Sequence, residues 1–287
     1  MAEEKKILPI KRISALMNGD AVKGKFAEIL GKRAPQFISS VMSAVNANSL
    51  LQNATPESVY GAGLMAATLD LPVNGNLGFA YIVPFNSKKK DPQTGKDVYV
   101  SEAQFQMGAK GYIQLAIRSG QYSKINVIPI KEGQLEIVDL VTETYKFNTP
   151  TSEKVVGYLG YFRLLNGFEK YLYMTVDELK KHGEKYSKTY RFGVWQSNFD
   201  AMAQKTVIKR LLSKYGILSI EMQKAQIYDQ GVLNKNENDV VDIDDEDIEY
   251  VDNDNNGQIT EMTAEEAAKQ GGNIGKVAEA MLKNGKE

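Results

Sequence analysis

Cationic, amide and aromatic side chains gather in one stretch of the chain, "QFQMGAKGYIQLAIRSGQY" (104–122). Its side chains with this chemistry include Gln104, Gln106, Lys110, Tyr112 and Arg118. Cations neutralise phosphates, amides donate and accept hydrogen bonds, and aromatic rings stack on bases. This mixture of residue types suits the backbone and the bases of a single-stranded nucleic acid.

A second cationic stretch, "FGVWQSNFDAMAQKTVIKRLL" (192–212), has the apolar spacing of a helix and no helix-breaking residue after Gly193. One long helix is therefore predicted here. On that helix Asn198, Lys205 and Lys209 share one narrow polar stripe, and Arg210 lies on a neighbouring face. The stripe fits the wall of a cationic groove, but it also fits lysines that reach solvent from a half-exposed helix. Periodicity alone leaves both readings open.

Two glycine-rich stretches resemble nucleotide-binding motifs, but the first lies in the wrong structural context and the second lacks residues that the motif requires. "GAGLMA" (61–66) needs a preceding strand to bind a dinucleotide, yet it lies inside a predicted helix that begins at Thr55 and Pro56. Small residues that let helices pack closely are the better interpretation. "GGNIGKV" (271–277) lacks the first glycine of a P-loop and has Val277 where Ser or Thr would hold magnesium. No nucleotide cofactor is expected.

Metal sites and catalytic groups are also poorly supported. The chain has no cysteine and one histidine, His182, which excludes imidazole- and thiolate-based metal sites. His182 is placed in the last turn of a short helix ending at Gly183, where a cation would favour the helix dipole. "DNDNNGQITEMT" (252–263) resembles a calcium loop but ends in Thr263 instead of glutamate. The acidic run 242–249 could supply carboxylates to a nuclease, yet it falls in a predicted linker. The chain is therefore expected to bind rather than catalyse.

Charge divides the chain into two unlike parts, although the net charge of its 287 residues is only −1. Residues 229–287 hold 16 acidic side chains and 5 lysines, a net charge of −11, so residues 1–228 carry +10. A basic body suits polyanionic partners, and a soluble body with a solvated tail is the plainer interpretation.

The sequence has no membrane-spanning run and no apolar signal region near its first residue, which indicates a cytoplasmic protein.

The order of predicted elements indicates an α+β fold. Helices precede residue 70, and strands with turn signals, among them Asn166-Gly167, follow from residue 77, interrupted by a helix at 108–120. We expect a body at 1–230, an acidic disordered linker at 231–260, and a small helical module at 261–287 that binds a partner.

Three stretches together resemble the RecT family of phage and prophage single-strand annealing proteins, over about residues 20–225. They are "LMAATLDLPVNGNLGFAYIVPF", "EAQFQMGAKGYIQLAIRSGQY" and "WQSNFDAMAQKTVIKRLL". One departure is "SKYGILS", where a proline-containing turn is expected. The resemblance implies a mixed, mostly antiparallel sheet packed with helices into a basic DNA groove. It also implies DNA contacts by Lys110, Tyr112, Lys205, Lys209 and Arg210.

The same resemblance implies a function without ATP. A protein of this family binds single-stranded DNA and anneals complementary strands in phage-type recombination, as a ring or helical filament in the bacterial cytoplasm. Its partners would be a phage exonuclease or the host single-strand-binding protein, met through the C-terminal module. Two other functions stay open, a metal-dependent DNA nuclease and an acidic-tailed scaffold or adaptor.

Overall fold

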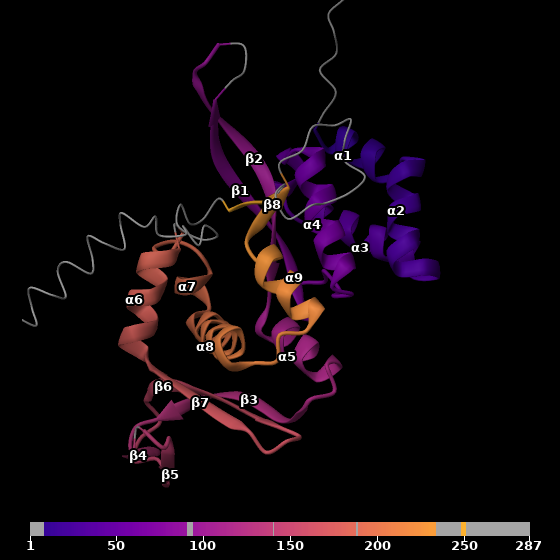
Figure 1. Cartoon of the computed structure of the whole chain (residues 1–287). Coiled ribbons are helices and arrows are strands. Elements are labelled where there is room, and N and C mark those ends of the chain that lie inside the picture. The colour runs from indigo at the N-terminus through magenta and orange to yellow at the C-terminus, as the bar shows by residue number, and fades with distance from the viewer. Residues whose placement is uncertain (1–8, 91–93, 140, 188, 234–247, 251–287) are drawn as a thin grey trace, which may run out of the picture. The chain divides into compact units, whose positions relative to one another are not determined.

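The computed structural model describes residues 9–90, 94–139, 141–187, 189–233 and 248–250 (Figure 1). Most of the expected linker and all of the expected helical module at 261–287 lie outside the described residues. Those two expectations therefore stay predictions.

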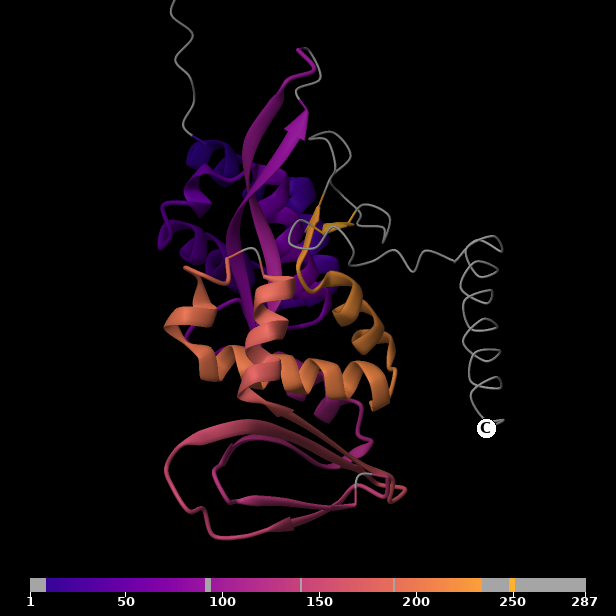
Figure 2. The same ribbon diagram turned by 90° about the vertical axis from the view of Figure 1, so that its left-hand side faces the viewer.

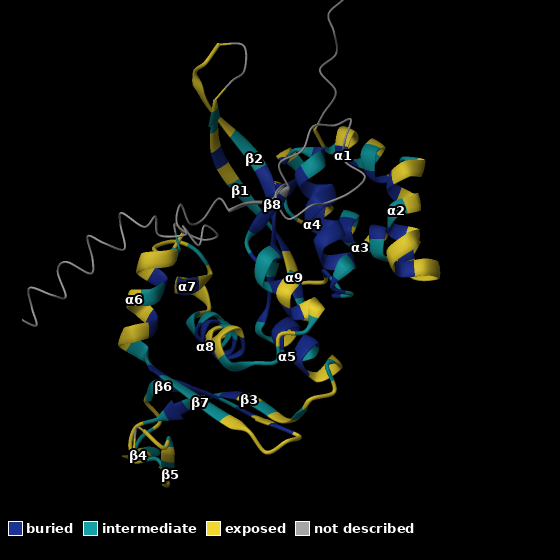
Figure 3. Ribbon diagram, in the orientation of Figure 1, coloured by how far each residue is buried: buried dark blue, intermediate teal, exposed yellow. Residues whose placement is uncertain are grey.

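The first part of the chain is helical, as predicted. It comprises α1 (Pro9–Met17), α2 (Asp20–Leu30), α3 (Ala34–Asn46) and α4 (Pro56–Thr68), with short 3-10 turns at Gly31–Arg33 and Leu51–Asn53. Thr55 is the N-cap of α4, and the helix is buried along most of its length (Figure 3). A Cβ built at Gly63 would lie 3.3 Å from a methyl group of Val41. Gly63 of "GAGLMA" thus serves helix packing, as predicted.

Two long strands follow, β1 (Ala80–Lys90) and β2 (Asp97–Met107), paired antiparallel as the turn signals predicted. The hairpin is joined to α4 by Ser58, whose hydroxyl accepts a hydrogen bond from the Ala103 N–H at 2.9 Å. One face of the hairpin carries Ile82 and Phe105, both buried in the core that α4 shares. The opposite face carries Tyr81 and Gln106, which are cross-strand partners.

Helix α5 (Ala109–Arg118) begins directly after β2, close to its predicted position. A Cβ at Gly108 would lie 2.1 Å from the carbonyl oxygen of Gly78, and one at Gly111 would lie 2.3 Å from that of Phe79. No other residue type fits at these positions without moving the backbone. The two glycines therefore bring the start of α5 against the loop that precedes β1.

A three-stranded antiparallel sheet follows, with the order β3 (Tyr122–Lys131), β6 (Val155–Leu164), β7 (Glu169–Thr175). The β6–β7 hairpin turns at Asn166-Gly167, where Gly167 has a φ of 90°, so this predicted hairpin is confirmed. A small hairpin of β4 (Leu135–Asp139) and β5 (Thr144–Phe147) is inserted between β3 and β6. Helix α8 (Phe199–Tyr215) lies across the sheet (Figure 2), where a Cβ at Gly160 would come within 2.9 Å of Val207.

The long helix predicted from residue 192 is wrong in its first half. The structure has a short α7 (Val194–Ser197) and a separate α8 (Phe199–Tyr215), interrupted at Asn198, whose φ of −150° is not helical. The side-chain oxygen of Asn198 instead accepts a hydrogen bond from the Ala201 N–H and caps α8. Asn198 therefore caps the helix rather than joining the lysine stripe on its surface.

The helix end predicted at Gly183 is also wrong, because α6 (Val176–Tyr186) continues past it. A Cβ at Gly183 would lie 2.7 Å from the ring of Tyr190 and 2.9 Å from that of Trp195. This glycine makes room for two aromatic rings, which a sequence pattern cannot distinguish from a helix stop.

The described chain ends with α9 (Ile220–Tyr228) and two short paired strands, β8 (Gly231–Leu233) and β9 (Ile248–Tyr250). Both strands fall within the range expected to be linker. The α+β class is confirmed. Among the described strands every pairing is antiparallel and divided among four separate sheets, in place of the single mixed sheet that the resemblance implied.

Candidate nucleic-acid interface

The side chain of Asp229, just after α9, is buried and accepts hydrogen bonds from three elements. One carboxylate oxygen accepts from the Met107 N–H at 2.8 Å and lies 3.5 Å from Nζ of Lys205. The other accepts from the Tyr112 hydroxyl at 2.9 Å and from Nζ of Lys209 at 2.8 Å. Asp229 therefore ties β2, α5 and α8 to the end of α9.

The charges in this cluster are coupled. Burial disfavours the ionised form of Asp229, but the ammonium groups of Lys205 and Lys209 outweigh it and hold the pKa of the carboxyl well below its ordinary value. Burial and the same carboxylate raise the pKa of Tyr112 well above its ordinary value. At neutral pH the cluster thus holds two ammonium groups, one carboxylate and one neutral phenol, a net charge of +1.

The two lysines differ in how much of them reaches the surface. The Lys205 side chain is 13% exposed and that of Lys209 is 29% exposed, while the Asp229 side chain is not exposed at all. Neither lysine is a free surface cation. Lys209 combines an ion pair with partial exposure, so it is better placed than Lys205 to meet a phosphate.

The backbone of Gln230 extends this cluster to two predicted site residues. The Gln104 amide donates to the Gln230 carbonyl at 2.7 Å, and the Gln106 amide donates to the Gln104 side chain at 2.7 Å. Gln104 is buried, whereas Gln106 is half-buried. Gln230 has a φ of 69°, which is unusual for a residue other than glycine. Residues 229 and 230 together gather Tyr112, Lys205, Lys209, Gln104 and Gln106.

Lys110 lies apart from this cluster, exposed in the first turn of α5. A Cβ built at Gly78 would lie 3.5 Å from Cδ of Lys110 and 3.4 Å from Oη of Tyr81. Tyr81 is 37% exposed. A cation and a partly exposed ring therefore flank the same glycine, an arrangement that suits a phosphate and a base.

The remaining predicted site residues have structural contacts. The Arg118 guanidinium donates to the carbonyl oxygens of Leu69 at 2.8 Å and Asp70 at 2.7 Å, which satisfies the C-terminal end of α4. Arg210 is exposed, with Nη1 4.0 Å from the sulfur of Met174. Asn198 caps α8, as described above. The structure does not bring these three into the Asp229 cluster.

Sequence reasoning missed Asp229 and Tyr81. Asp229 was counted with the acidic tail, because nothing in "QIYDQG" marks its carboxylate as buried. Tyr81 lies within an apolar strand pattern, and only its position opposite Gln106 shows that it faces away from the core. His182 also differs from expectation, because burial, with the charge of Arg210, lowers its pKa to about 4 and keeps the imidazole neutral at pH 7.

Two features are absent from the part of the chain that the structure describes. No helix among the described residues combines the length and the apolar composition that crossing a membrane requires. No group of three or more His, Cys, Asp or Glu side chains in the described ranges is arranged to hold a metal ion.

The fold class is an α+β body in which two lysines surround one buried carboxylate, and comparison with known proteins supplies the family. Residues 35–248 match the model of the RecT family, so the chain belongs to the RecT family. It is 46% identical over 231 residues to the uncharacterized protein YqaK of Bacillus subtilis strain 168, covering 78% of this chain and 76% of that protein. It is 26% identical over 223 residues to Protein RecT of Escherichia coli strain K12, covering 76% and 80% of the two chains. Membership supports a single-strand annealing role in recombination, and it implies single-stranded DNA binding and oligomerisation.

Proposed function

We propose that this protein binds single-stranded DNA and anneals it to a complementary strand without ATP, as an oligomer, in phage-type recombination. The observation that carries the proposal is the match of residues 35–248 to the RecT family. No cofactor or metal takes part in the proposed reaction, and the protein forms no covalent bond with DNA. The proposed setting is the bacterial cytoplasm.

The proposed mechanism is physical. Lys110 and Lys209 neutralise phosphates and hold the strand extended, while Tyr81 stacks on a base. Lys205 and Asp229 act as positioning residues. Lys205 is mostly buried, and the buried carboxylate of Asp229 holds Lys209 in place through an ion pair. The Tyr112 ring is fully buried, so we assign it to the cluster and not to base stacking. Annealing then proceeds because base pairing and stacking release free energy once two unpaired strands meet.

Sequence-independent annealing requires contacts to phosphates and base faces rather than to base edges. Exposed Lys110, partly exposed Lys209 and the Tyr81 ring are groups of this kind. We also propose that the chain beyond the described body recruits a protein partner, a phage exonuclease or the host single-strand-binding protein.

A gel experiment tests the function against its rivals. Two complementary labelled oligonucleotides are added in turn to the full-length protein, with magnesium in one series and EDTA in the other, and the products are separated after the protein is removed. The proposal expects full-length duplex in both series. Shortened strands in magnesium alone would support a nuclease instead. Intact strands in both series, with no more duplex than in the protein-free control, would support a scaffold instead.

A further inference from the structure

Apolar side chains are exposed at both ends of α8. Before the helix, Phe192 is 78% exposed and Val194 is 54% exposed. After it, Leu218 is 61% exposed and Ile220 is 70% exposed. We call the first pair the leading patch and the second pair the trailing patch. The 17 residues of α8 separate them by about 25 Å at a rise of about 1.5 Å per residue.

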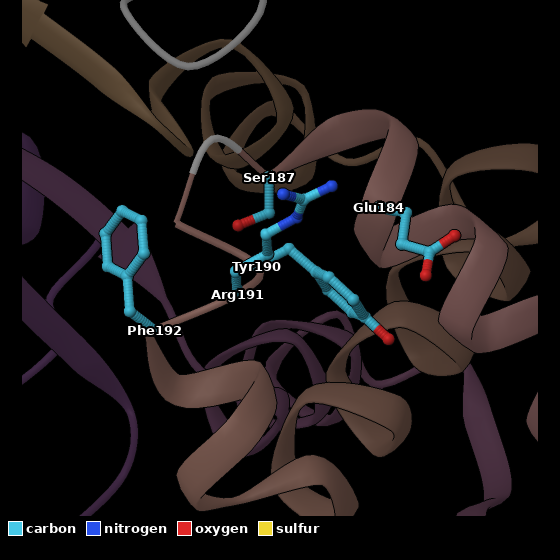
Figure 4. Close-up of a pocket in the computed structure, with 5 residues that line it drawn as sticks. All are labelled: Glu184, Ser187, Tyr190, Arg191 and Phe192. Carbon is cyan, nitrogen blue, oxygen red and sulfur yellow. The ribbon is translucent and has the colours of Figure 1, made fainter.

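The leading patch borders a hollow of about 560 Å³ lined by Glu184, Ser187, Tyr190, Arg191 and Phe192 (Figure 4). In this view Tyr190 and Arg191 lie between Phe192 on one side and Glu184 on the other. Tyr190 is fixed in place, since its ring packs 5.9 Å from that of Trp195 and against Gly183. The exposed Arg191 side chain forms no ion pair with any residue of the described chain. The hollow thus offers apolar surface and one cation that this part of the chain leaves unpaired.

The trailing patch is held by the turn between α8 and α9. The Ile217 N–H donates to the Tyr122 hydroxyl at 2.7 Å, and the Ser219 hydroxyl caps α9 by accepting from the Met222 N–H at 3.2 Å. Leu218 and Ile220 therefore project from an anchored turn. Glu221 follows directly, and its exposed carboxylate has no ion-pair partner within the described chain. The trailing patch thus offers apolar side chains beside one carboxylate that is available to an outside cation.

We propose that the trailing patch of one copy of this chain docks on the leading patch of the next copy, with Glu221 facing Arg191. The charges of Arg191 and Glu221 are opposite in sign, and each stands next to the two apolar side chains of its patch. The patches lie at opposite ends of α8, so one copy cannot join its own two. A contact between two different patches leaves a free patch at each end of a pair, so it repeats into a ring or filament.

The contact adds an oligomer interface to the proposed function, because copies that bind one strand side by side need surfaces through which they contact one another. Four apolar side chains bury less area than the roughly 1,000 Å² that a stable interface needs, so free copies associate weakly. Binding to a common strand raises the local concentration of each patch. Assembly is therefore expected to strengthen on single-stranded DNA. Only this effect of DNA rests on the proposed function; the contact between two copies does not.

Cross-linking tests the contact cleanly, because the chain has no cysteine of its own. Full-length Val194→Cys and Leu218→Cys variants are prepared separately and treated with a short bis-maleimide, alone and mixed, with and without an oligothymidylate that holds several copies. The expected result is a covalent dimer in the mixture and none with either variant alone, increased several-fold by the oligonucleotide. The matched control replaces Leu218→Cys by Ser39→Cys, which is exposed on α3 and not on α8, α9 or the turn between them.

Charge reversal gives a second readout in the same cysteine backgrounds. Arg191→Glu in the Val194→Cys chain, or Glu221→Arg in the Leu218→Cys chain, should each lower the yield several-fold, and mixing the two reversed chains should restore it. Dimers from Leu218→Cys alone, a yield no higher than with Ser39→Cys, or no restoration on mixing would overturn the contact. Oligothymidylate binding by each variant is measured in parallel. Loss of cross-linking with binding retained refutes the contact alone, and loss of binding by the unmodified protein refutes the proposed function.

Discussion

At the scale of single residues, the buried carboxylate of Asp229 decides how the cationic candidates are to be understood. Two lysines that look like surface cations in the sequence share one buried anion. Removing one partner of a buried ion pair leaves the other charge uncompensated, which costs more than removing a surface pair. We therefore expect substitutions at Lys205 and Lys209 to change stability together with the proposed DNA contacts, whereas a substitution at Lys110 should change the proposed contact alone.

We predict that Asp229→Asn lowers the free energy of unfolding by about 3–5 kcal/mol, because it leaves two ammonium groups facing a neutral amide in a buried site. Urea unfolding at neutral pH measures the loss. The pKa of Asp229 is depressed in the folded state, so its stabilisation is present above the ordinary carboxyl pKa and is lost as pH falls through the depressed one. Asp20→Asn, at an exposed aspartate at the start of α2, is the control. Equal stability of the two variants would show that the cluster contributes nothing to folding.

A second residue-scale prediction concerns Lys110, which is exposed and makes no contact with Asp229. Lys110→Ala should weaken single-stranded DNA binding while leaving the unfolding transition unchanged. The slope of log affinity against log salt should become shallower by about 0.7 for each phosphate that the variant no longer neutralises. Lys32→Ala, an exposed lysine near the N-terminal helices, is the matched control. An unchanged slope for Lys110→Ala would remove this lysine from the interface.

At the scale of elements, local sequence signals correctly predicted those turns, helix starts and hairpins that depend on residues close together in the chain. The Asn166-Gly167 turn, the Pro56 start of α4 and the β1–β2 hairpin depend on backbone preferences within a few residues. The break at Asn198 was missed because an apolar spacing typical of a helix continues across it. Gly183 was misread because the two rings that require it come from a later loop and from α7.

The candidate site was predicted only in part for the same physical reason. Residue types could indicate which side chains suit a nucleic acid, and Lys110 is exposed as such a role requires. The pairing of Asp229 with Met107 spans 122 positions in the sequence, so no local pattern encodes it. Arg118 and Asn198 have the right chemistry for DNA, yet the structure uses their side chains to complete the ends of helices.

The next prediction concerns the stability of the junction between α9 and β8. Gln230 has a φ of 69°, which glycine adopts at little cost. Its contacts to Phe105 and Gln104 use only its backbone atoms, so Gln230→Gly keeps them. Gln230→Gly should change the free energy of unfolding by less than about 1 kcal/mol, whereas Gln230→Val should lower it by about 1–3 kcal/mol. Thermal unfolding of both variants checks the ranking, and a valine variant as stable as the glycine variant would contradict it.

At the scale of the whole molecule, the charge asymmetry of the sequence separates a basic body from an acidic end, +10 over residues 1–228 and −11 over residues 229–287. The cationic candidates all lie in the body. We predict that a chain ended after Tyr250, which keeps β8 and β9, still anneals DNA in vitro, whereas recombination in cells falls because a partner is no longer recruited. Annealing rates and recombination frequencies of the same truncation measure the two effects. Loss of annealing from a folded truncation would place the end of the chain in the DNA machinery.

In the proposed function, the protein itself anneals complementary strands without ATP. The most direct measurement follows energy transfer between two labelled complementary oligonucleotides after the full-length protein has bound the first strand, with and without ATP. We expect annealing to be faster than the spontaneous rate, unchanged by ATP and progressively slower as salt rises. An annealing rate equal to that of DNA alone, or one that requires ATP, would contradict it.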